Sequence, residues 1–87
     1  MDRSQAYAVL SKELTFFAGR PWRDLAIEVG SSKEIEVQVE HEICYLKLNI
    51  DWADEEKNRI KISGCLNGPS WWRLERLEER IFVKRPL

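Results

Sequence analysis

The segment VEHEIC, residues 39–44, places the one histidine of this chain between two glutamates and three residues before a cysteine. Such side chains can bind a metal or act as acid, base or nucleophile. A catalytic zinc needs three protein ligands, however, and zinc deaminases use a His-x-Glu spacing in which Ile43 would have to be glutamate. We therefore expect His41 to be an exposed hairpin residue, and we predict no catalytic residue, metal site or cofactor.

Other reactive residues in the sequence lack the partners that chemistry requires. The glycine-containing segment SGCLNGPS has no Lys-Ser/Thr pair after it, so it is not a phosphate-binding loop. The acidic group formed by Asp51, Asp54, Glu55 and Glu56 is typical of a solvated turn. No nucleophile has a histidine nearby as its base. We infer that the protein is not an enzyme.

Composition describes one small folded domain, residues 1–87. Hydrophobic residues make up 44% and charged residues 33%, as in ordinary globular proteins. Fourteen basic and fifteen acidic residues give a net charge of −1, which argues against a nucleic-acid partner. The C-terminal third is more basic, but glutamates are interspersed there, which indicates a solvated face. The first residues do not read as a signal peptide, and no apolar run could span a bilayer, so we expect a cytoplasmic protein.

Two helices are predicted at the N-terminus. Residues 4–18 carry apolar side chains at helical spacing, and the glycine and proline that follow end the helix: Tyr7, Leu10, Leu14 and Phe17, then Gly19 and Pro21. A short second helix has Pro21 at its start and Gly30 just past its end. Its apolar residues lie at i, i+3, i+4 and i+7, namely Trp22, Leu25, Ala26 and Val29.

From residue 34 the apolar period becomes two, which predicts three half-buried antiparallel strands over about residues 34–40, 44–52 and 59–66. Matching the apolar faces sets Val39 opposite Cys44, and Ile50 opposite Ile60. The hairpin turns then fall at His41–Glu42 and around ADEEKN. In this register Cys44 faces the core and Cys65 faces the polar side, so both cysteines should remain free thiols.

The segment SWWRLERLEERIFVKRPL fits either a helix or two short strands. If it is a strand, Trp72 is in the core, where it could lie over Gly64, and Trp71 points to the polar face. If it is a helix, Trp71 joins the buried stripe instead. The strand interpretation gives a candidate interface on the polar face, made of Trp71, Tyr45, Cys65 and Lys47.

Several segments resemble a small family of uncharacterised bacterial proteins that run helix, short helix, β-meander. They are RPWRDLAIEVG as the short helix, NIDW at the end of a strand, NRIKISGCLNGPSWW as strand, turn and tryptophan, and RIFV as the closing strand, all within about residues 14–84. The resemblance implies an α+β fold with strands at the C-terminus. It implies no activity.

These observations predict a single α+β domain in which two N-terminal helices pack on one face of a four- or five-stranded antiparallel β-meander. The function we expect is a non-catalytic protein-interaction or regulatory module. Its partner would be an unknown protein or a second copy of the chain, with no nucleic acid and no membrane involved. The alternative is an immunity-type or antitoxin-like inhibitor that acts through its acidic hairpin tips, and a small enzyme is the least favoured.

Overall fold

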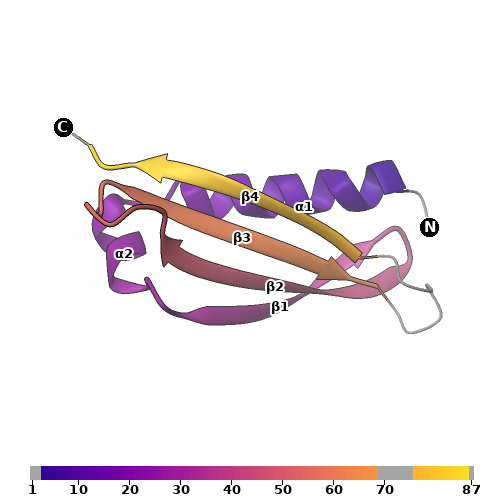
Figure 1. Cartoon of the computed structure of the whole chain (residues 1–87). Coiled ribbons are helices and arrows are strands. Elements are labelled where there is room, and N and C mark those ends of the chain that lie inside the picture. Colours follow the sequence, from indigo (N-terminus) through magenta and orange to yellow (C-terminus); the bar gives the residue numbers. More distant parts are fainter. Residues whose placement is uncertain (1–2, 69–75, 87) are drawn as a thin grey trace.

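The computed structural model describes residues 3–68 and 76–86. Within these residues the chain forms two helices followed by a four-stranded antiparallel sheet of order β1-β2-β3-β4, which confirms the predicted α+β architecture. Figure 1 shows α1 lying across one face of the sheet, with α2 beside the end where β1 begins. The elements are α1 (Arg3–Ala18), α2 (Trp22–Ile27), β1 (Ser32–Val39), β2 (Glu42–Trp52), β3 (Arg59–Asn67) and β4 (Arg76–Lys84).

Helix α1 buries one narrow stripe against the sheet. Ala6, Leu10 and Leu14 are buried at four-residue spacing, which places them on one side of the helix. Tyr7, expected on this stripe, is half-exposed at its edge and donates a hydrogen bond from its hydroxyl to Glu79 of β4. The next helix, α2, ends at Ile27, and Gly30 follows with a φ of 89° that suits glycine.

The pairing of the first two hairpins differs from the prediction by two residues. Val37, not Val39, lies opposite Cys44, because the turn is formed by Glu40 and His41, with Glu40 in the left-handed region at a φ of 57°. In the second hairpin Ile50 lies opposite Ile62 rather than Ile60. A shift of two residues leaves every side chain on the same face. The predicted division into an apolar and a polar face is therefore correct, although both registers were wrong.

The C-terminal segment is a strand where the structure describes it. Residues 76–84 form β4, in which Ile81 pairs with Ile62 and Leu77 with Leu66 of β3. The helical alternative is thereby excluded for residues 76–80. The alternative of two short strands is wrong for these residues as well, because they belong to one continuous strand with residues 81–84. Trp71 and Trp72 lie outside the described residues.

The core lies between α1, α2 and the apolar face of the sheet. Gly64 allows the closest approach of helix to sheet, because a Cβ atom there would lie 2.9 Å from Cδ1 of Leu10 and 3.1 Å from Cδ2 of Leu14. Both cysteines are free thiols, as predicted, with Cys44 buried in the core and Cys65 half-buried on the other face. Neither helix in the described part of the chain is long and apolar enough to span a bilayer. The buried apolar residues are Ala6, Leu10, Leu14, Leu25, Val39, Cys44, Leu46, Leu48, Ile50, Ile60, Ile62, Leu66 and Leu77.

Candidate functional site

The side of the sheet opposite α1, which we call the open face, presents the polar half of each strand. The alternation of the strands fixes its membership, because successive side chains point to opposite sides. From β1 to β4 the open face carries Ser32, Glu34, Glu36 and Gln38; Ile43, Tyr45, Lys47, Asn49 and Asp51; Arg59, Lys61, Ser63, Cys65 and Asn67; and Arg76, Glu78, Arg80, Phe82 and Lys84.

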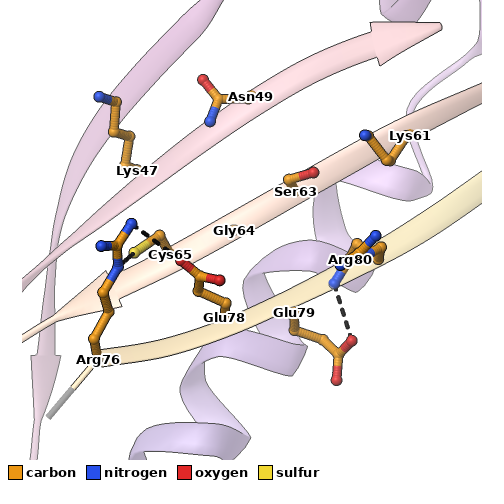
Figure 2. A pocket seen from close by; sticks show the side chains of 10 residues that line it. All are labelled: Lys47, Asn49, Lys61, Ser63, Gly64, Cys65, Arg76, Glu78, Glu79 and Arg80. Carbon is orange, nitrogen blue, oxygen red and sulfur yellow. Dashed lines mark hydrogen bonds and ion pairs between the residues drawn. The ribbon is translucent and has the colours of Figure 1, made fainter. Parts of the chain in front are cut away.

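A hollow of about 470 Å³ lies in the middle of the open face, over β2, β3 and β4. Figure 2 shows the side chains that surround it, which come from all three strands. Four of them are cations, while two carboxylates and three uncharged polar groups complete the lining. They are Lys47, Lys61, Arg76 and Arg80; Glu78 and Glu79; and Asn49, Ser63 and Cys65, with the backbone of Gly64 between them.

One end of the hollow is organised by Arg76. Its Nε donates a hydrogen bond of 3.0 Å to Sγ of Cys65, and its Nη2 lies 3.0 Å from Oε1 of Glu78. The hydrogen bond to Cys65 and the charge of Glu78 both raise the pKa of Arg76, so the guanidinium stays charged. Because the side chains of Arg76 and Glu78 are both about two-thirds exposed, their ion pair contributes little to folding.

The second carboxylate of the lining, Glu79, turns away from the cations. It belongs to the core-side row of β4, opposite Gly64, and Figure 2 shows it pointing away from the side chains in the middle of the hollow. There it accepts hydrogen bonds from the Tyr7 hydroxyl and from the backbone N–H of Arg80, which lower its pKa. Lys47, Lys61 and Arg80, in contrast, form no ion pair with any described residue. The hollow is therefore positive.

Charge changes sign across the open face. On β1 the described side chains of this face include two carboxylates, Glu34 and Glu36, and no cation. On β3 and β4 the face carries five cations against one carboxylate, Glu78; the cations are Arg59, Lys61, Arg76, Arg80 and Lys84. The C-terminal glutamates that seemed to balance these cations in the sequence do so incompletely, because strand alternation sends Glu79 to the other side.

Three of the four residues predicted for the interface come together. Lys47 pairs directly with Cys65 across β2 and β3, and Tyr45 is two residues from Lys47 on the same face. Trp71 lies outside the described residues. The prediction did not include Lys61, Arg76 and Arg80, which line the same hollow. The sequence signal for Arg76 and Arg80 is their even spacing, which places both side chains on one face if the segment is a strand.

The residues that the sequence offered as candidates for catalysis or metal binding do not lie together in the structure. His41 is exposed at the first turn, while Cys44 is buried on the core side of β2, so the two do not converge. The carboxylate of Asp54 accepts hydrogen bonds from the backbone N–H groups of Asn58 and Arg59, which lower its pKa and close the second hairpin loop. In the described part of the chain no three histidine, cysteine or carboxylate side chains are grouped as metal ligands would be.

No protein-family model, curated protein or solved structure matches this chain.

Proposed function

We propose that this protein is a non-catalytic protein-interaction module and that the open face of the sheet is its binding surface. The main support for the proposal is that large apolar side chains are exposed on the open face, which the described helices do not cover. Ile43, Tyr45 and Phe82 are there with 52%, 47% and 49% of their surfaces exposed. Tyr45 adjoins the hollow, beside Lys47 of the same strand, and a half-exposed aromatic side chain next to charged groups is typical of an interface anchor.

Binding suits the chemistry of the hollow better than catalysis does. Its lysine, arginine, amide and hydroxyl groups can hold an anionic group through charge-assisted hydrogen bonds. General acid–base catalysis works best with a group that titrates near neutral pH, and the chain's histidine lies at a hairpin turn rather than in the hollow.

The inhibitor hypothesis receives less support. It relied on an acidic hairpin tip, but Asp54 is bonded within its own loop. Glu55 and Glu56 are exposed there, beside the exposed cation Lys57. The tip thus presents fewer available carboxylates than the sequence suggested, whereas the open face presents a larger surface.

The proposal has two further parts, the family resemblance and the cellular location. The order of helix, short helix and meander supports the resemblance to the uncharacterised bacterial family, which brings no activity with it. We also propose a cytoplasmic location, a reducing compartment in which Cys44 and Cys65 would stay reduced.

The test begins with capture of partners from the source cells by the full chain, followed by affinity measurements with the purified partner. We expect Tyr45→Ala to weaken binding at least tenfold. The matched control is Phe16→Ala, which removes a 70% exposed aromatic side chain from α1, away from the open face. Equal affinity of Tyr45→Ala and wild type, or loss of binding with Phe16→Ala, would overturn the assignment of the open face.

A further inference from the structure

The charge pattern of the open face limits what its partner can be. Cations occupy β3 and β4, while β1 is acidic on the same face. We infer that the partner contributes an acidic segment of polypeptide that lies along β3 and β4 over the hollow. This inference rests on the proposed function, because it names the chemistry of the partner for the same surface.

The spacing of the cations fits an extended acidic segment. Along the two strands, Arg76 lies opposite Asn67, Arg80 opposite Ser63, and Lys61 opposite Phe82. From Ser63 to Lys61 is a step of two residues along β3, or about 7 Å, and from Arg76 to Arg80 is two such steps along β4. An extended peptide repeats its side chains on one face at the same interval of about 7 Å, so its carboxylates can meet successive cations.

The acidic and apolar parts of the open face restrict where that segment lies. Glu34 and Glu36 on β1 repel carboxylates, which confines an acidic segment to the far half of the sheet. Asp51 of β2, which lies opposite Lys61, limits the segment at that end of the hollow. Tyr45 lies in the same cross-strand row as Arg76, two strands away across Asn67, and therefore marks one end of the hollow. An apolar residue at the matching end of the partner segment would contact Tyr45 and fix its direction.

Single-stranded nucleic acid fits this surface less well. Stacking of bases needs open aromatic faces next to the cations. Arg59 already lies over the Phe82 ring, 5.7 Å from its centroid, and Tyr45 lies directly opposite Glu36. Glu78 adds a negative charge beside Arg76 within the hollow.

The experiment measures binding of fluorescent peptides and oligonucleotides to the purified full chain by anisotropy. The probes are a 12-residue peptide that alternates glutamate with serine, the same peptide with glutamine for glutamate, and a 12-nucleotide oligothymidylate. We expect the glutamate peptide to bind and the glutamine peptide not to bind. We also expect affinity for the glutamate peptide to fall with added salt, as exposed charge pairs require.

Charge reversal locates the binding. Arg80→Glu and Lys61→Glu should each weaken peptide binding at least tenfold. Lys12→Glu, which reverses an exposed cation on α1, should weaken it less than twofold. Circular dichroism checks that each variant is folded, and Arg80→Gln serves as a milder change if Arg80→Glu does not fold.

Each contrary result has a distinct meaning. No binding of the glutamate peptide, or equal effects of Arg80→Glu and Lys12→Glu, overturns the acidic partner; if Tyr45→Ala still weakens the captured partner, the proposed function survives. Oligothymidylate that binds tenfold tighter than the peptide and depends on Tyr45 overturns the inference in favour of nucleic acid. A dimer in sedimentation that Arg80→Glu dissociates, with no peptide binding, overturns it in favour of a second copy.

Discussion

Gly64→Ala tests how closely α1 packs on the sheet. The added Cβ would lie 2.9 Å from Leu10 Cδ1 and 3.1 Å from Leu14 Cδ2, whereas carbon atoms in contact normally lie about 3.5–4.0 Å apart. Both leucines are at most 2% exposed, so their methyl groups have little room to retreat, and either these side chains or the helix must shift. Overpacking of this kind costs about 1–3 kcal/mol.

A smaller effect acts in the opposite direction. Replacing glycine by alanine restricts the unfolded chain and stabilises the folded state by about 0.4–1 kcal/mol. The two ranges together leave a net loss of about 0–2.6 kcal/mol, with about 1.3 kcal/mol at their midpoints. For a domain of 60–100 residues each kcal/mol shifts the melting temperature by about 4–8 °C, so at the midpoint thermal unfolding followed by circular dichroism should show a decrease of roughly 5–10 °C.

Two comparisons make this test specific. Gly19→Ala adds a Cβ whose nearest neighbours are backbone oxygens at 3.5 and 3.6 Å, which are ordinary contacts, and should change stability by about 0.5 kcal/mol or less. Combining Gly64→Ala with Leu14→Ala should cost less than the sum of the two changes, because the shorter side chain removes one of the clashes. A Gly64→Ala variant more stable than wild type, which the effect on the unfolded chain alone would produce, would refute the close packing of α1 on β3.

Three further outcomes follow from named contacts. His41→Ala should change the free energy of unfolding by about 0.5 kcal/mol or less in urea titrations, since the side chain is exposed at a turn; a loss above roughly 2 kcal/mol would contradict that position. Thiol titration should find two thiols in unfolded, non-reduced protein, but in the native state Cys65 should react first, because Cys44 is fully buried and burial raises its pKa. The carboxylate oxygens of Glu28 lie 2.7 Å from Lys33 Nζ and 2.7 Å from Arg20 Nη1. The pKa of Glu28 is lowered, and the hydrogen bond from Lys33 is the largest cause. The contribution of this carboxylate to stability is thus complete above about pH 4.3 and lost as pH falls through the lowered folded pKa. Glu28→Gln should therefore be less stable than wild type at pH 7, and the difference should shrink as the pH is lowered below about 4; a difference that stays the same over that range would contradict the ion pairs.

The helices and strands, and the face that each of them buries, could be predicted because buried residues recur in the sequence at the period of a helix or of a strand. Leu10 and Leu14 repeat at helical spacing, and Leu46, Leu48 and Ile50 alternate with polar residues. The strand registers could not be predicted in the same way. Every even shift of a hairpin keeps the apolar residues on the core side, so the face rule leaves several registers equally acceptable.

The turns decide between those registers, and their chemistry is weakly marked here. Type I′ turns favour Asn-Gly or Asp-Gly, and neither pair occurs between β1 and β2, so turn chemistry does not mark the position of the first turn. The chain nevertheless turns at Glu40 and His41, with Glu40 in the left-handed region that glutamate adopts at some cost. In the second hairpin the loop is closed by the Asp54 carboxylate and by the 2.9 Å hydrogen bond from Ala53 N–H to the Arg59 carbonyl, neither of which a pattern of apolar residues reveals.

Only part of the candidate site could be predicted, because the sequence pattern gives the face of a residue but not its strand partner. Tyr45, Lys47 and Cys65 could be placed on one face because β2 and β3 alternate clearly, but the direct pairing of Lys47 with Cys65 could not, since the predicted register sets Cys65 opposite Tyr45. For Arg76 and Arg80 the sequence indicates only a mixed, solvated segment, since charges counted along the chain nearly cancel. Folding divides that segment between two faces, with Arg80 on the open side and Glu79 bonded to Tyr7 on the other. A protein with a net charge of −1 can thus present a positive half-face, and the sign of a binding surface depends on strand pairing rather than on composition.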